Sequence, residues 1–240
     1  MEPKFSIVTG GSNGIGAAIC SHVLASSGSA VINIDKVPPA KTPAGEYVFV
    51  GADLTDPAET RRIAADLIRK YPVDALVNNA GVSIPAELQD VTEDAFVTTM
   101  NLHLQAAIIL AQAVVPGMKQ RRHGRIVNMS SRAALGKKAR TVYGGSKAAL
   151  IGMTRTWAME LGAFGITVNA VAPGPIVTEL FMRSNSQATV KQLIESTVVG
   201  RGGTPDDVAR ATMFFLAEAN GFVTGQVLHV CGGASLGSSW

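Results

Sequence analysis

Short apolar runs alternate with longer helix-like segments from one end of this chain to the other. The short runs are apolar on both faces of a strand, whereas the longer segments repeat apolar residues at helical spacing. Strands of this kind are typical of a parallel sheet that is covered by helices on both faces. The sequence therefore predicts an α/β fold, a single doubly wound domain over 1–240 with a seven-stranded parallel sheet. Strands are expected at 5–10, 30–35, 47–54, 73–81, 124–131, 166–174 and 226–233, and helices at 14–28, 56–71, 92–120, 143–162 and 205–218.

The composition excludes several classes of function. The formal charge is only +3, and the acidic and basic residues are interspersed along the chain. We therefore expect no nucleic-acid or membrane partner. Neither a leader nor an apolar stretch of about 18 residues is visible. The two cysteines and four histidines show no metal-ligand spacing, so no metal site is expected, and all four histidines, His103 included, are interpreted as structural or surface residues. These features predict a cytoplasmic protein with buried cysteines.

Two local patterns refine the expected elements. The segment 36–46 carries three prolines and no helical period, so a loop is expected between the second and third strands. Asp56 and Pro57 then suit the N-cap and the first turn of the next helix.

A glycine-rich turn, TGGSNGIG at 9–16, lies where the first strand passes into a helix. Glycines let the backbone approach a pyrophosphate, which the free N–H groups of the helix N-terminus then stabilise. The strict G-x-G-x-x-G spacing is absent. Asp35 ends the second strand, where a carboxylate accepts hydrogen bonds from an adenosine ribose. Together they predict a dinucleotide site.

Tyr143 and Lys147 are four residues apart and therefore share one helix face. A tyrosine with a pKa of about 10 is a poor base near neutrality, and lowering the pKa to about 7 takes about 4 kcal/mol. A lysine ammonium nearby would favour the phenolate. Gly144 and Gly145 lie between the pair, although each glycine costs a helix about 1 kcal/mol relative to alanine. Either a close approach requires them or alanine would serve equally well.

These motifs occur in a familiar order. T-G-x-x-x-G-x-G at 9–16, NNAG at 78–81, Asn101, a serine in IVNMSS and Y-x-x-x-K at 143–147 together resemble the classical short-chain dehydrogenase/reductase family. The segments APGPIVTEL and GRGGTPDDVA also match, so the resemblance covers essentially the whole chain. It implies a Rossmann-type fold and a nicotinamide cofactor, with a departure at Cys231, where the family usually carries an aspartate.

The resemblance also implies site residues. Tyr143 would be the general acid/base, Lys147 would hold the nicotinamide ribose, and Asn101 would fix a water in a proton relay. The catalytic serine is either Ser130 or Ser131; we favour Ser131 because a one-residue loop deletion is easier than a shift of strand register. Cofactor contacts are expected from Gly10, Ser12, Asn13, Gly14, Ile15, Gly16, Asp35, Asp53, Leu54, Asn79, Ala80, Gly81, Tyr143, Lys147, Pro173, Ile176 and Thr178.

The expected function is an NAD-dependent oxidoreductase that acts on a small secondary alcohol or ketone, which would bind beneath a variable lid at about 180–200. NAD is expected rather than NADP because Asp35 would repel a 2′-phosphate. The first alternative is a 3-oxoacyl carrier-protein reductase, against which Phe164 stands where such reductases carry a basic residue, although Arg122 would fit. The second is a non-catalytic NAD-binding scaffold. By resemblance, a homotetramer is expected.

Overall fold

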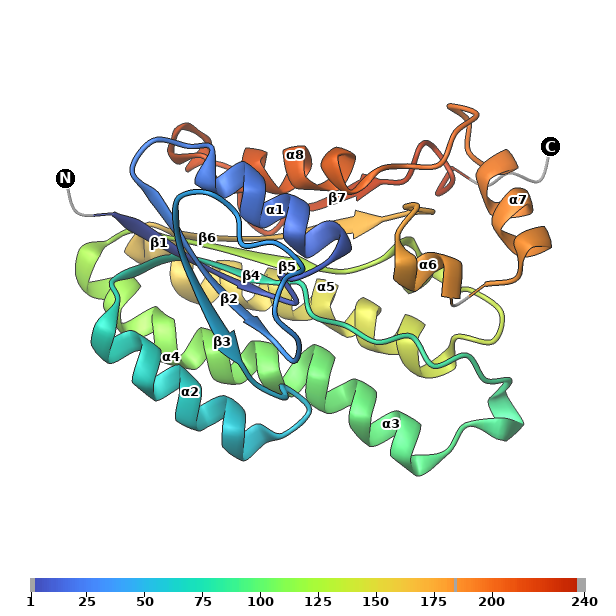
Figure 1. Cartoon of the computed structure of the whole chain (residues 1–240), viewed down its shortest axis with the longest axis horizontal. Coiled ribbons are helices and arrows are strands. Elements are labelled where there is room, and N and C mark those ends of the chain that lie inside the picture. Colours follow the sequence, from blue (N-terminus) through green and yellow to red (C-terminus); the bar gives the residue numbers. More distant parts are fainter. Residues whose placement is uncertain (1–2, 184, 237–240) are drawn as a thin grey trace.

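The computed structural model of the chain describes residues 3–183 and 185–236 (Figure 1). Its seven strands form one sheet in the order β3-β2-β1-β4-β5-β6-β7, and each neighbouring pair is parallel. This confirms the predicted sheet. The strands are β1 (Lys4–Thr9), β2 (Ser29–Asp35), β3 (Glu46–Gly51), β4 (Val73–Asn78), β5 (Gly124–Met129), β6 (Ile166–Pro173) and β7 (Val227–Val230).

Helices cover both faces of this sheet. In Figure 1, α1 and α8 lie above it, and α2, α4 and α5 lie below it. The described helices are α1 (Gly14–Leu24), α2 (Pro57–Lys70), α3 (Glu93–Met100), α4 (Ala106–Arg121), α5 (Thr141–Leu161), α6 (Glu179–Arg183), α7 (Gln187–Glu195) and α8 (Pro205–Leu216).

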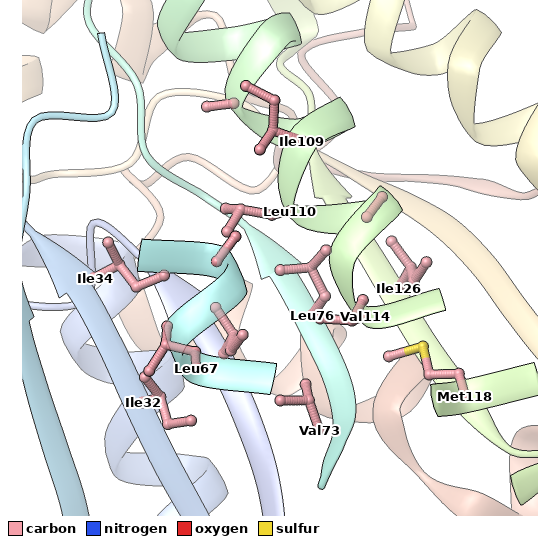
Figure 2. Packing of buried hydrophobic residues seen from close by; sticks show 14 of the residues in the cluster. Ile32, Ile34, Leu67, Val73, Leu76, Ile109, Leu110, Val114, Met118 and Ile126 are labelled. Carbon is pink, nitrogen blue, oxygen red and sulfur yellow. The ribbon is translucent and has the colours of Figure 1, made fainter. Parts of the chain in front are cut away.

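Each face of the sheet has its own apolar core. Ile7 belongs to the cluster under α2 and α4, whereas its neighbour Val8 belongs to the cluster under α1 and α8. Leu76 and Val77 of β4 divide in the same way, because successive side chains of a strand point to opposite faces. Figure 2 shows the first cluster, in which residues of the sheet meet helices α2 and α4. Because both faces of the sheet are buried, the sequences of the strands are continuous apolar runs.

The ends of several elements differ from the expected ones. The first helix ends at Leu24 instead of residue 28, and β4 and β5 end at Asn78 and Met129 because the chain then turns out of the sheet. The expected helix 92–120 contains a π-helical turn, Asn101–Gln105, between α3 and α4. Beyond β6, the expected lid carries two short helices, α6 and α7.

The segment between β2 and β3 contains no helix, as its prolines predicted. The expected start of α2 is also confirmed: the Asp56 carboxylate accepts hydrogen bonds from the N–H groups of Ala58 (2.8 Å) and Glu59 (3.2 Å), and Pro57 is the first helical residue.

The continuous helical stretch Glu93–Arg121 is long and apolar enough to cross a membrane by length and composition alone, which the sequence reading did not anticipate. Its residues Ile109, Leu110, Val114 and Met118 are buried in the core beneath the sheet, where Figure 2 shows them. A helix buried in a protein core can be equally long and apolar, and the packing of this helix beneath the sheet accounts for its apolar character.

Candidate active site

One large cavity of roughly 500 Å³ opens at the carboxyl ends of the strands. It lies where the strand order reverses between β1 and β4, the usual position of a ligand site in an open α/β sheet. Of the expected site residues, the cavity lining includes every one except Ser12 and Asn101. Residues from the whole length of the chain are therefore brought together at this edge of the sheet.

The glycine turn forms one wall of this cavity. Gly10 and Gly14 have φ angles of 66° and 54°, in the left-handed region that glycine adopts readily. A Cβ on Gly16 would overlap the carbonyl oxygen of Gly10, so this position has no room for a side chain. Helix α1 starts at Gly14, and its first N–H groups have no partner within the helix. The turn thus suits a phosphate group.

A second turn, after β4, is fastened to the glycine turn. The Thr9 hydroxyl oxygen accepts hydrogen bonds from the N–H groups of Asn79 and Ala80, both at 2.9 Å. The Asn79 side-chain amide donates to the carbonyl oxygens of Thr9 (2.9 Å) and Gly10 (3.2 Å). Asn79 thus fixes the geometry of the glycine turn in addition to lining the cavity.

Beside the glycine turn, the Asp35 carboxylate accepts a hydrogen bond from the N–H group of Ser12 (3.0 Å). The Ser12 side chain is buried, and its hydroxyl donates to the Val37 carbonyl oxygen (2.6 Å). The Ser12 side chain therefore does not face the cavity, which differs from its expected cofactor contact. It holds the glycine turn against the end of β2 instead.

Asp53 is anchored close to Asp35. Burial raises the pKa of Asp53, but hydrogen bonds from Lys36 and Thr55 outweigh this effect and lower the pKa to about 2. The Lys36 ammonium lies 2.8 Å from the Asp53 carboxylate. Leu54, next in the chain, is buried and also lines the cavity. Lys36, the cation adjacent to Asp35, is thus engaged by another carboxylate.

The segment after β6 closes the cavity over the glycine turn. Pro173, Ile176 and Thr178 line it, and the Thr178 methyl carbon lies 3.4 Å from where a Cβ of Gly14 would stand. The lid that follows contributes Leu180 and Phe181.

Tyr143 and Lys147 lie on the opposite wall, at the start of α5. The Ser131 side chain lies within hydrogen-bonding reach of Tyr143 and lowers the pKa of its phenol. The Lys147 ammonium donates to the Met129 carbonyl oxygen (2.8 Å) and lies 5.8 Å from the centre of the Tyr143 ring. Burial lowers the pKa of Lys147 to about 7.

The neighbouring serine points elsewhere. The Ser130 hydroxyl is buried and donates to the Lys147 carbonyl oxygen (2.8 Å), so it fastens the end of β5 to helix α5. The Ser131 side chain also accepts a hydrogen bond from the Ala133 N–H group (3.1 Å). The geometry favours Ser131 as the serine that contacts a substrate.

The pKa of Tyr143 differs from the expectation. Burial raises it, and although Ser131 and the positive charge of Arg140 lower it, burial has the larger effect. The protein alone therefore keeps the phenol protonated, because the side chain is withdrawn from water.

Asn101 lies outside the lining of this cavity. Its side-chain amide donates to the Thr55 carbonyl oxygen (3.1 Å), and it opens the π-helical turn. It therefore ties this helix to the segment that follows β3.

His103, two residues further on, is the residue that sequence reasoning missed. Its imidazole is buried and packs edge-on against the Tyr143 ring, with 5.7 Å between the ring centres. The Val82 N–H group donates to Nε2 (2.9 Å), so Nε2 carries no proton. Nδ1–H then donates to the Ser146 hydroxyl (2.8 Å), which donates to the Tyr143 carbonyl oxygen (2.8 Å). Burial, helped by the charge of Lys147, lowers the pKa of His103 to about 2.

His103 thus connects the turn after β4 to the first turn of the Tyr143 helix. Its only signal in the sequence is a histidine within an apolar helical segment beside Asn101. A single histidine of this kind is common in protein cores, so the pattern could not reveal its partners.

The two glycines of α5 have different surroundings. A Cβ on Gly144 would lie 2.9 Å from the Ala133 carbonyl oxygen, whereas a Cβ on Gly145 would meet no atom within 4 Å. Close approach therefore explains Gly144, and alanine would fit at Gly145. The close neighbour is the short helical turn that follows Ser131.

A doubly wound sheet, a glycine cradle at its switch point and a Ser–Tyr–Lys wall define a Rossmann-type oxidoreductase. A family model described as enoyl-(acyl carrier protein) reductase matches residues 10–235. The chain belongs to the short-chain dehydrogenase/reductase family, whose members bind a nicotinamide cofactor.

Curated relatives and solved structures match over nearly the full length. A (2S)-((R)-hydroxy(phenyl)methyl)succinyl-CoA dehydrogenase subunit of Thauera aromatica is 35% identical, covering 98% of both chains. A 3-oxoacyl-(acyl-carrier-protein) reductase of Thermotoga maritima is also 35% identical, covering 97% of this chain and 98% of its own. A proposed NAD(P)-dependent gluconate 5-dehydrogenase of Beutenbergia cavernae, solved with NADP at low occupancy, is 30% identical with a TM-score of 0.92, covering 99% of this chain and 98% of its own.

Proposed function

We propose that this protein transfers a hydride between a secondary alcohol or ketone and NAD, with Tyr143 as the general acid/base. The observation that carries the proposal is the convergence of Ser131, Tyr143 and Lys147 on one wall of a cavity whose other end holds the glycine turn and Asp35. The glycine turn, Asp35 and Lys147 would hold a nicotinamide cofactor, which would supply the hydride chemistry. The chain's own residues must then bind the substrate oxygen and move its proton.

Each side chain has a defined part in this proposal. The Ser131 hydroxyl, within hydrogen-bonding reach of Tyr143, would hold the substrate oxygen beside the phenol. Tyr143 would take the hydroxyl proton in oxidation and return it in reduction. Lys147, held by the Met129 carbonyl, would bind the nicotinamide ribose. Asn101 enters through family resemblance as the residue that holds a relay water.

Because burial raises the pKa of Tyr143, the phenol needs nearby positive charge to ionise near neutrality. Arg140 supplies part of that charge, and the oxidised nicotinamide ring would add to it when bound. We therefore expect alcohol oxidation to accelerate with rising pH, since the phenolate is the form that accepts the proton.

Tyr143→Phe tests the proposal directly. This variant removes the hydroxyl but keeps the ring, so turnover should vanish while NADH binding, followed by fluorescence titration, stays close to that of the unmodified protein. Substantial residual turnover would rule out Tyr143 as the acid/base. Lys138→Met, on an exposed side chain of the preceding loop, is a suitable control.

The preference for NAD rests on Asp35. A 2′-phosphate placed 4 Å from this carboxylate would be repelled by about 4 kcal/mol at an effective dielectric of 20. Lys36, the adjacent cation that could offset this repulsion, lies 2.8 Å from Asp53. We therefore expect kcat/KM with NAD to exceed that with NADP at least tenfold, or about 1.4 kcal/mol. Comparable kcat/KM values with the two cofactors would overturn this assignment.

The alternative of a carrier-protein reductase requires a docking surface beside the end of α4. There the Lys119 ammonium lies 4.3 Å from the centre of the Phe164 ring, and Arg122 donates to the Ala163 carbonyl oxygen (3.0 Å). Both cations are thus partly engaged within the chain. Equal reduction of a free 3-oxoacyl thioester and its carrier-bound form would argue against this alternative. A non-catalytic scaffold would reduce neither the free thioester nor the carrier-bound form.

We also propose a homotetramer in the cytoplasm. Phe96 and Val97 on α3, Met159 on α5 and Phe214 on α8 are exposed although apolar, which suits faces covered by further copies. A light-scattering mass of one 24.9 kDa chain would contradict the tetramer.

A further inference from the structure

Basic side chains gather at the substrate end of the cavity. Arg132, Lys137 and Arg140 line it, and all three come from the segment between Ser131 and Tyr143. This segment, RAALGKKAR at 132–140, contains no aspartate or glutamate. Three cations thus enter the catalytic cavity on one short loop that carries no balancing charge of its own.

These cations differ from an ordinary solvated basic loop. Arg140 is only 8% exposed and Lys137 is half-buried, whereas Lys138 on the same loop is exposed and lies 3.9 Å from Glu87 outside the cavity. Among the described residues, Arg132 and Lys137 bond only to neutral oxygens: the Ala234 carbonyl (3.3 Å) and the Asn185 side chain (3.4 Å). The loop therefore turns its charge inward.

The three charges are close enough to act on one another. Burial lowers the pKa of Lys137, and the positive charges of Arg140 and Arg132 lower it further. Like charges in a partly buried site repel, and an anion bound among them would relieve that repulsion. Glu179, an acidic residue of the lid that lines the cavity, pairs with Arg183 of the same helix.

Their position relative to Tyr143 sets where such an anion would lie. Arg140 is close enough to the phenol for its positive charge to offset part of the rise that burial causes in the pKa of Tyr143. The adenosine end, marked by Asp35 and Asp53, is formed by residues that follow β2 and β3. Figure 1 shows the β5–α5 connection on the side of α6 and α7 instead. The loop that carries the cations therefore lies at the Tyr143 end of the cavity.

We propose that the substrate is an anion, a hydroxy acid or phosphorylated alcohol and its oxo counterpart, whose negative group binds Arg132, Lys137 and Arg140 while its carbinol carbon faces Tyr143. This inference rests on the proposed function, since it names the substrate class of the same site. It predicts that neutral alcohols of equal size are poor substrates, because they offer Arg132 and Lys137 no negative group to bind.

The test compares matched substrates. With NAD, oxidation of 2- and 3-hydroxybutanoate is measured against their methyl esters, and oxidation of glycerol 3-phosphate against glycerol. The unmodified protein should favour one class of anion over its neutral counterpart at least tenfold in kcat/KM. Lys137→Met and Arg140→Met should erase that preference mainly through KM, and Lys138→Met should not. Comparing the hydroxybutanoate pair with the glycerol 3-phosphate pair shows whether the bound anion is a carboxylate or a phosphate.

A binding measurement separates this inference from the proposed function. Calorimetry on the NADH-loaded protein, with butanoate and with inorganic phosphate as probes, should show binding of one probe that Lys137→Met weakens at least tenfold. Such binding without turnover of any alcohol would support the anion site and contradict the proposed function. Neutral substrates used as well as anionic ones, or no binding of either probe, would overturn the inference. Lys137→Met serves if Arg140→Met, at a buried position, fails to fold.

Discussion

Gly144 and Gly145 are adjacent in one helix, yet replacing each by alanine should have opposite effects. Alanine is favoured over glycine inside a helix by about 0.5–1 kcal/mol. At Gly145 the new Cβ would meet no atom within 4 Å, so the whole gain should appear. For a chain of this size we expect Tm to rise by roughly 2–4 °C per kcal/mol.

At Gly144 the same gain is opposed by a contact. The new Cβ would lie 2.9 Å from the Ala133 carbonyl oxygen, which is backbone and cannot rotate away. Overpacking of this kind costs about 1–3 kcal/mol, more than the helix gains. The Gly144 N–H group also donates to the Arg140 carbonyl oxygen (2.7 Å), so the helix start is not free to retreat.

The contact also links stability to activity. Ala133 donates its N–H group to the Ser131 side chain, so displacing Ala133 would displace Ser131 from the Tyr143 phenol. Gly144→Ala should therefore lower Tm and reduce kcat severalfold, whereas Gly145→Ala should raise Tm and leave kcat unchanged.

Thermal unfolding and steady-state kinetics at equal protein concentration give both quantities, and Gly145→Ala is the matched control. If Gly144→Ala raised Tm as much as Gly145→Ala, the approach of the loop to α5 would not be rigid. The physical explanation of Gly144 would then be wrong.

Three further predictions follow from the site. Ser131→Ala should reduce kcat more than Ser130→Ala, because the Ser131 side chain lies beside the Tyr143 phenol whereas the Ser130 hydroxyl donates to the Lys147 carbonyl oxygen. The reverse order in steady-state kinetics would show that Ser130 serves the substrate. His103→Gln should lessen the loss of stability in acid. The pKa of His103 is about 2 in the folded protein, below its usual value of 6.5, so between these pH values the imidazole is protonated only in the unfolded chain. The stability of the unmodified protein therefore falls as the pH drops from 6.5 towards 2. The slope reaches about 1.4 kcal/mol per pH unit, and urea unfolding that shows equal slopes in the two proteins would contradict it. Asp35→Ala should narrow the gap between NAD and NADP chiefly by lowering kcat/KM with NAD, and an unchanged ratio would remove Asp35 from the selectivity argument.

Local sequence patterns predicted most of the fold and most of the residues that line the cavity. The strands, the glycine turn and the Tyr143–Lys147 pair depend on spacing along the chain, which the sequence displays directly. The prolines between β2 and β3 excluded a helix for the same reason.

The remainder depends on packing between distant segments. Whether Ser130 or Ser131 turns towards Tyr143 is decided by how β5 ends against α5, and the sequence alone left it open. His103 acquires its partners only because a π-helical turn places it between the β4 turn and α5. The pKa of Tyr143 could not be anticipated either, since it depends on the extent of burial.

The hydrogen bonds of Thr9 fix the dinucleotide end of the cavity before any ligand arrives. Its hydroxyl binds the N–H groups of Asn79 and Ala80, and the Asn79 amide returns to the Thr9 and Gly10 carbonyls. Two turns that are distant in the chain thus behave as one body, so a dinucleotide has little backbone to order when it binds. The segment that loses conformational entropy on binding should instead be the lid, which closes over the substrate. This favours a compulsory order of binding, with the cofactor first and the substrate second.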